Sequence, residues 1–238
     1  MSKYRIRKLK FNNSDDFNLY LELKSFFMTE IMENNPSFVG IVNNMQVNSN
    51  NQALKAKIYA YLPFLKNTLD VYVLEELVNT SDSKQTYQAI AYTSINKNAY
   101  IDGELDIDRK NTISIENLFV NPTHRLSSET LELLKYAIRS STEGENKSVT
   151  FNVLSTNPNK YFHFALADCV LMEQIFINNI DMSKISMYYL YCEDSNKILN
   201  TTIKELFEKA VILQHEPTYK NTNIPLSLCE DLDLDPTL

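Results

Sequence analysis

Glycine is nearly absent from this chain. Only three glycines occur among 238 residues, whereas average usage of about 7% would give roughly 17. Gly40, Gly103 and Gly144 lie far apart in the sequence. The phosphate-binding P-loop and the dinucleotide-binding fingerprint both need clustered glycines, because their backbone approaches phosphate closely. The sequence therefore excludes both motifs.

Cysteine pairs, tryptophan and long apolar runs are missing as well. The three cysteines, Cys169, Cys192 and Cys229, are widely spaced and form no C-x-x-C pair, so neither a disulfide framework nor a zinc knuckle is predicted. The basic segment 3–10 is followed by polar residues instead of the apolar run of a signal peptide. No stretch approaches the roughly 18 apolar residues of a membrane span. We expect a cytoplasmic protein that binds no metal and no membrane.

Basic charge is in short supply. The net charge is −7, from 23 basic and 30 acidic residues. Residues 215–238 carry −4 of this charge, so the rest of the chain carries −3 and is nearly neutral. Because nucleic-acid-binding domains usually present a basic patch or stripe, no nucleic-acid partner is expected.

The sequence does contain a regular succession of strand and helix patterns. Alternating apolar and polar residues predict strands over 3–10, 69–78, 86–95, 112–120, 147–154 and 185–192. Apolar residues at helical spacing predict helices over 14–33, 51–65, 127–141, 157–167 and 201–213. The second and third strands form an antiparallel hairpin. This order predicts an α/β (α+β) protein with a mixed sheet flanked by helices.

One segment carries a specific resemblance to a known family. Residues 115–137, IENLFVNPTHRLSSETLELLKYA, combine a strand, a loop and a helix. They resemble the cofactor motif of the GNAT superfamily of acyl-CoA-dependent N-acyltransferases: a strand with L-x-V-x-P-x-x-R, a loop with x-x-G-x-G/A, and a helix with two leucines. Leu118, Val120, Pro122 and Arg125 keep this register. With less specific matches, the resemblance covers about residues 3–192.

The resemblance implies a GNAT-like, mostly antiparallel sheet and acetyl-CoA or another acyl-CoA as cofactor. In that family a strand binds the acyl carbonyl and the pantetheine arm through its backbone, and the following loop and helix start bind the pyrophosphate. The cofactor-binding residues implied here are Leu118, Phe119, Val120, Arg125, Leu126, Ser127, Ser128, Thr130 and Asn157.

The loop departs from the family at its glycines. Counted from Arg125, the two glycine positions hold Ser128 and Thr130, with Glu129 between them. A serine hydroxyl can donate to phosphate, but threonine is bulky and a carboxylate repels pyrophosphate. The same residues make a favourable helix start, because an acidic residue in the first turn complements the helix dipole. The loop is thus either a phosphate site or simply a capped helix.

The family's catalytic tyrosine is also missing. Counted from the helix-opening Asn157, its position holds Phe164, which cannot donate a proton. Tyr161, about one turn earlier, is the candidate acid, and core packing is the alternative for both rings. His163 is not expected to face the same site as Phe164, because one residue rotates by about 100° around a helix.

Glu116, on the cofactor strand, is the candidate general base, with Glu75 and Glu76 as further candidates.

Two functions follow. The first is a divergent acyl-CoA-dependent N-acyltransferase, in which an amine attacks the acyl carbon directly. The second is a catalytically silent protein of the same fold that acts through protein contacts. The missing tyrosine and the glycines missing at 128, 130 and 168 leave both open.

We divide the chain into a GNAT-like domain over 1–195, an additional C-terminal helix over 196–214 and an extended acidic tail over 215–238. The tail alternates apolar and acidic residues from Ile224 to Asp235. This pattern is typical of a peptide that docks on another protein, and equally of a disordered chain end. The C-terminal helix and tail are therefore the candidate contacts for a protein partner or a second copy.

Overall fold

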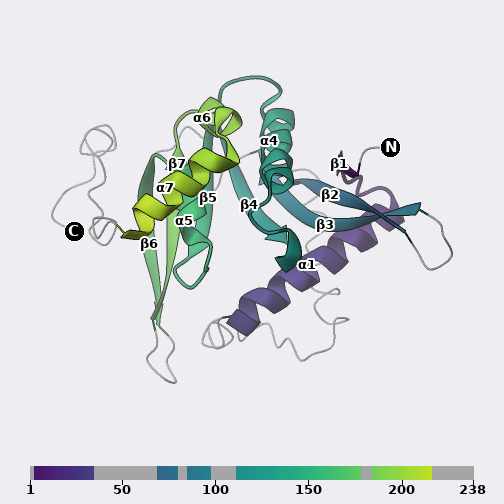
Figure 1. Ribbon diagram of the computed structural model, residues 1–238, viewed down its shortest axis with the longest axis horizontal. Helices are drawn as coiled ribbons and strands as arrows, with labels where there is room; N and C mark the ends of the chain where they lie inside the picture. The colour runs from purple at the N-terminus through teal and green to yellow at the C-terminus, as the bar shows by residue number, and fades with distance from the viewer. Residues whose placement is uncertain (1–2, 35–68, 80–84, 98–110, 178–183, 216–238) are drawn as a thin grey trace.

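The computed structural model describes residues 3–34, 69–79, 85–97, 111–177 and 184–215 (Figure 1). Within these ranges, seven strands form one sheet in the order β1-β2-β3-β4-β5-β7-β6. Their bounds are Tyr4–Lys8 (β1), Leu69–Asn79 (β2), Gln85–Asn96 (β3), Thr112–Val120 (β4), Ser148–Leu154 (β5), Cys169–Ile177 (β6) and Lys184–Cys192 (β7). Every neighbouring pair is antiparallel except β4 and β5. The predicted mixed, mostly antiparallel sheet is confirmed.

Helices cover both faces of this sheet. They are α1 (Ser14–Asn34), α4 (Ser128–Thr142), α5 (Lys160–Leu166), α6 (Ser195–Asn200) and α7 (Ile203–His215), with a short 3₁₀ turn at Pro122–His124. Successive strand side chains point to opposite faces. In β2, Val73 packs in the cluster of α1, while Leu74 packs in the cluster that contains Leu133 of α4. Figure 1 accordingly shows α1 set apart from α4, α5 and α7.

The expected elements differ from the observed ones at three places. The strand β6 (Cys169–Ile177) and the helix α6 (Ser195–Asn200) are present but are not predicted from the sequence. The helix expected from residue 157 begins at Lys160. The helix expected over 51–65 and the tail over 215–238 lie outside the described residues, apart from His215 at the end of α7. The domain boundary at 195 stays a prediction.

Strands β4 and β5 diverge along their length. Residues Thr112–Ile115 of β4 pair with Ser148–Phe151 of β5 in parallel. Beyond this point, residues 117–120 of β4 pair only with β3, and residues 152–154 of β5 pair only with β7. The two strands therefore open toward the loop that leads into α4, and their facing backbone edges are unpaired with each other.

A β-bulge lies where the two strands begin to open. Asn117 is opposite Ser94 and Ile115 is opposite Ile95, so Glu116 has no partner in β3. An extra residue in one strand reverses which side chains face which side of the sheet. Ile115 packs in the core under α4, while Phe119 packs against the cluster of α1. The bulge thus sets Glu116 at the mouth of the opening.

Candidate functional site

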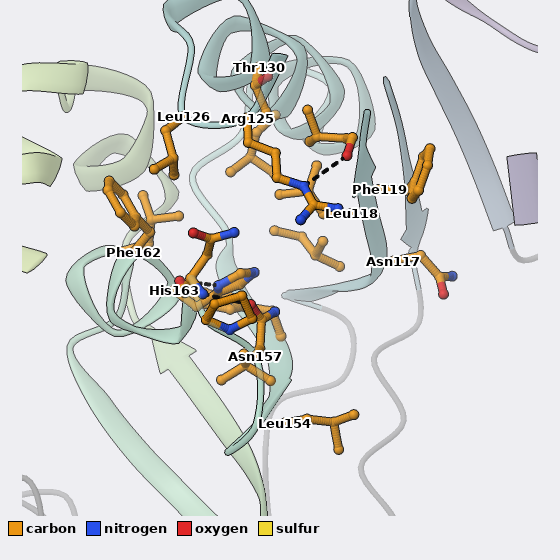
Figure 2. A pocket seen from close by; sticks show the side chains of 18 of the residues that line it. Asn117, Leu118, Phe119, Arg125, Leu126, Thr130, Leu154, Asn157, Phe162 and His163 are labelled. Carbon is orange, nitrogen blue, oxygen red and sulfur yellow. Dashed lines mark hydrogen bonds between the residues drawn. The ribbon is translucent and has the colours of Figure 1, made fainter. Parts of the chain in front are cut away.

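A cleft of about 330 Å³ occupies the opening between β4 and β5. Its walls are the second half of β4, the loop 125–127, the first turns of α4, the end of β5 and α5. Phe27, Glu30 and Ile31 of α1 complete it from the other face of the sheet. Figure 2 shows Leu118, Arg125, Leu126 and His163 around this space. The cleft therefore reaches from α1 to α5 through the divergence of the two strands.

Most of the residues expected at a cofactor site converge here. Those that line the cleft are Leu118, Phe119, Val120, Arg125, Leu126, Ser127, Thr130 and Asn157, together with the candidate base Glu116. Ser128 lies elsewhere, beside Tyr4 and Tyr136 in a separate hollow on the other side of the α4 N-terminus. The structure thus gathers eight of the nine implied cofactor residues.

Tyr161 is not among the residues that line the cleft. Its ring packs against both core clusters on the α4 and α5 side, with its centroid 6.1 Å from that of Phe164. Phe164 is itself buried. The placement of both rings is that of packing residues.

The loop before α4 is held by its own hydroxyl groups. Ser127 is the N-cap of α4, and its Oγ accepts a hydrogen bond of 3.2 Å from the backbone N–H of Thr130. The Thr130 hydroxyl donates to the carbonyl of His124 at 3.2 Å. Between these contacts, Leu126 has a φ of 60°, a left-handed conformation that side chains seldom adopt. The side chain of Thr130 thus serves as a loop brace at a family glycine position.

Glu129 does not enter the cleft. It lies with Ser128 in the hollow beside Tyr4. Its pKa is lowered, first by a hydrogen bond from its own backbone N–H and then by the Ser128 hydroxyl. The carboxylate therefore stays ionised at the helix N-terminus, where the dipole favours it, and outside the space that a cofactor would occupy.

Arg125 spans the mouth of the cleft. Its Nε donates to the carbonyl oxygen of Val120 at 3.2 Å, which fixes the side chain at the end of β4. Its Nη2 forms an ion pair with Glu30 of α1. Among the described residues that line the cleft, Arg125 is the only arginine or lysine. It is therefore the cation available to an anionic ligand, with Glu30 as its present partner.

Glu116 faces a lysine on α1. Burial raises the pKa of Glu116, and hydrogen bonds with Ser114 and Asn96 oppose this rise. Burial also lowers the pKa of Lys24 to about 8, against the attraction of Glu116. The Nζ of Lys24 donates to Oδ1 of Asn117 at 2.6 Å. A carboxyl group with a raised pKa at this position suits a general base near neutral pH.

His163 lines the cleft while its neighbour Phe164 is buried in the core, so the two side chains face different ways, as the sequence predicts. The cleft-facing residues of the α5 segment are Asn159, Phe162, His163 and Leu166, a helical spacing that could have identified this face if the helix start had been known. Nδ1 of His163 lies 3.2 Å from the carbonyl oxygen of Asn159, which can only accept, so Nδ1 carries the hydrogen. Burial lowers the pKa of His163. Its Nε2 is then a proton acceptor in the cleft.

Two other kinds of site receive no support from the described residues. No group of three or more His, Cys, Asp or Glu side chains there is placed to hold a metal ion. No described helix is long and apolar enough to cross a membrane.

Comparison with known proteins gives a likeness of general architecture. No protein-family model and no curated protein matches the chain. A spermidine/spermine N-acetyltransferase from Vibrio cholerae has 13% identity and a TM-score of 0.45, over 83% of this chain and 96% of that one. A putative acetyltransferase, YncA, from Salmonella typhimurium with its cofactor acetyl-CoA has 14% identity and a TM-score of 0.47, over 81% and 94%. An N-acetyltransferase from Staphylococcus aureus has 10% identity and a TM-score of 0.47, over 81% and 99%.

Because the sequence identities and the TM-scores are low, these structures carry no argument about the function of this chain. The chain itself supplies the opening between β4 and β5 and, at that opening, the strand, loop and helix of residues 115–137.

Proposed function

We propose that the chain is a divergent acyl-CoA-dependent N-acyltransferase, which transfers an acyl group such as acetyl directly to an amine. The observation that carries this proposal is the cleft between β4 and β5, on which eight residues of the implied cofactor set converge. Unpaired backbone N–H and C=O groups on the two diverging strands need hydrogen-bonding partners. The amide groups of a pantetheine arm match that need.

The residues present also fit the diphosphate end of such a cofactor. The first turn of a helix has N–H groups without partners inside the helix, and the dipole there favours anions. Ser127 and Thr130 place the first turn of α4 against the cleft, and Arg125 adds a guanidinium. Glu129 turns away. Thr130 limits how closely a phosphate can approach, so we expect weaker binding than a glycine loop would give.

The chemistry follows from the groups on either side of the opening. Bound acyl-CoA would supply the acyl thioester. Backbone N–H groups of β4 beyond the bulge would stabilise the developing negative charge on the carbonyl oxygen. Glu116, held at the bulge with a raised pKa, would accept a proton from the amine. On α5, Nε2 of His163 would take up or return a proton, since His163 lines the cleft and Tyr161 does not.

Titration calorimetry with acetyl-CoA tests the proposal. Variants of the two partners of the Arg125–Glu30 ion pair are expected to change acetyl-CoA affinity in different ways. Wild type should bind at a stoichiometry of one. Arg125→Gln should weaken binding by about tenfold or more, because charge-assisted hydrogen bonds to phosphate are lost. Glu30→Gln should leave binding equal or stronger, because it frees Arg125 from its partner.

Arg139→Gln is the matched control, since Arg139 is exposed in the last turn of α4 and should leave binding unchanged. Absence of heat and of any thermal stabilisation at millimolar acetyl-CoA would overturn the proposal. If Arg125→Gln and Arg139→Gln lose the same amount of acetyl-CoA affinity, Arg125 is not the anion site.

The alternative is a catalytically silent protein of the same fold that acts through protein contacts. It is favoured by the buried Phe164 at the tyrosine position and by the hydroxyl groups that brace the loop. Its contact surface would include α7, where Val211 and Ile212 are more than half exposed. Under this alternative, Val211→Lys changes the sedimentation of the full chain while acetyl-CoA does not bind. Binding of acetyl-CoA with unchanged sedimentation would exclude it.

A further inference from the structure

Lys24 of α1 is half-buried. It is not itself a lining residue of the cleft, but it lies next to two residues that are. Its Nζ donates to Oδ1 of Asn117 at 2.6 Å and lies 5.1 Å from the ring centroid of Phe27. Asn117 and Phe27 both line the cleft. Lys24 takes part in none of the ion pairs of the described residues. The charge of Glu116 acts on it and opposes the lowering of its pKa by burial.

The position of Lys24 relates directly to the reaction proposed above. Asn117 follows the bulge residue Glu116 on β4, the strand whose backbone would hold the acyl carbonyl. The Lys24 ammonium is thus one hydrogen bond away from that strand. It approaches from the face of α1, opposite to the face on which α4 would bind the diphosphate.

Burial also changes the reactivity of this amine. The pKa of Lys24 is lowered to about 8, so a substantial share of the side chain is uncharged at mildly alkaline pH. Lys204, whose side chain is 83% exposed, serves as the comparison lysine outside the site. The uncharged amine is the nucleophile, and burial produces it selectively at Lys24.

We propose that Lys24 is an acceptor of the acyl group bound in the cleft, so that the chain acylates itself at this residue. The inference rests on the proposed function. A bond forms between Nζ and the acyl carbon, and the bond between that carbon and the thioester sulfur breaks, its electron pair leaving on sulfur. The proton lost from Nζ passes to Glu116 and then to the thiolate, which leaves as the CoA thiol. The product is a stable amide.

Self-acylation would act back on the site. An acylated Lys24 carries no charge, and the attraction of Lys24 is one of the influences that lower the pKa of Glu116. Its loss would raise the pKa of Glu116 further. The modification would also enlarge the side chain beside Asn117 and Phe27, two residues that line the cleft.

Mass spectrometry of the full chain after incubation with acetyl-CoA tests this inference. We expect one acetyl group, mapped to Lys24, forming at least about tenfold faster than at exposed Lys204, since general base assistance typically contributes 10²–10⁴-fold. Lys24→Arg should abolish the adduct. Glu116→Gln should slow it by about tenfold or more. Excess CoA should suppress acetylation of Lys24 and not of Lys204, which separates acylation at the site from acylation in solution. Far-UV circular dichroism of each variant checks its folding.

Three results would overturn the inference. If acetyl-CoA binds in calorimetry but Lys24 stays unmodified, the self-acylation is wrong and the proposed function survives. If all lysines are acetylated at similar rates and CoA has no effect, the adducts reflect solution chemistry and not the site. If acetyl-CoA does not bind at all, both proposals fail together.

Discussion

Leu126 stores backbone strain at the centre of the cofactor loop. Its φ of 60° costs a residue with a Cβ roughly 1–2 kcal/mol relative to the usual conformations. Glycine avoids this cost. We therefore expect Leu126→Gly to be more stable than Leu126→Ala by about 1 kcal/mol, since both variants lose the same apolar side chain from the cleft. Urea denaturation of the two variants measures this difference.

An exposed position inside α4 provides the opposite control. At Ser140 the helix is regular and the side chain is exposed, so Ser140→Gly should be less stable than Ser140→Ala by about 1 kcal/mol. If the glycine variant is less stable than the alanine variant at position 126 as well as at position 140, Leu126 is not held in the left-handed conformation in solution.

Lys24 imposes a stability cost that depends on pH. Its folded pKa of about 8 lies below the ordinary value of 10.5, so the folded state binds fewer protons than the unfolded state between these values. Stability therefore rises with pH across this interval, and the cost of burying the charge is fully present below it. We expect Lys24→Met to be more stable than wild type by roughly 1–3 kcal/mol at pH 7.

This gain should shrink as the pH rises from about 8 to 10.5, because wild type then folds with an uncharged Lys24. Chemical denaturation of both proteins at several pH values measures this gain in the free energy of unfolding. The buried tyrosines titrate in both proteins, so their contribution cancels in the difference between the two free energies. Lys204→Met, at an exposed site, should show no such trend. A gain that is constant with pH would indicate that Lys24 has an ordinary pKa.

At the scale of elements, the N-terminus of α4 combines a structural cap with the proposed anion site. Two substitutions at Ser127 distinguish these two roles. Ser127→Ala removes the acceptor for the Thr130 N–H and should cost about 1 kcal/mol. Ser127→Asp retains a capping oxygen and should change stability by less than about 0.5 kcal/mol. Its carboxylate would nevertheless repel a diphosphate, so it should weaken acetyl-CoA binding by about tenfold. Denaturation and calorimetry on the same samples measure both effects.

If the loop is only a helix cap, Ser127→Asp will leave every ligand response as it is in wild type. If the two variants lose binding in proportion to their loss of stability, the loss reflects folding and the anion site is not at Ser127.

Elements with local patterns could be predicted from the sequence, and elements set by distant pairing could not. The block from β4 to α4 was predicted within a residue, because alternation and a serine cap are encoded within it. The start of α5 was missed because Asn157 forms a turn of its own, accepting from the N–H of Asn159 at 2.8 Å. That turn moves the helix start to Lys160 and brings His163 to the cleft.

The bulge at Glu116 illustrates the same limit within the site. The sequence placed Glu116 on the correct strand, but only the register between β4 and β3 shows that this residue is unpaired. Lys24 and Glu30 were missed for a related reason. Their relevance comes from α1 crossing the opening of a sheet whose strands lie about 90 residues further along the chain, as their contacts with Asn117 and Arg125 show.

At the scale of the whole molecule, the C-terminal helix α7 contributes two of the residues that line the cleft. Ile203 and Leu206 of α7 line the cleft together with Leu131 of α4 and Leu166 of α5. Leu206 is buried with Leu131 and Ala165. The helix that we separated as an additional element therefore closes the apolar end of the site, and its packing and the site's integrity should be coupled.

This coupling predicts that Leu206→Ala destabilises the whole domain by about 2–4 kcal/mol, the usual cost of removing a buried leucine side chain. Far-UV circular dichroism and tyrosine fluorescence should give one coincident unfolding transition, shifted as a unit, because a small single domain unfolds cooperatively. The variant should also weaken acetyl-CoA binding, since Leu206 lines the cleft. Val211→Ala, on the exposed face of the same helix, should change stability by less than about 0.5 kcal/mol. Two separate transitions, with only the first moved by Leu206→Ala, would show that α7 unfolds on its own and that the boundary at residue 195 marks a real division of the chain.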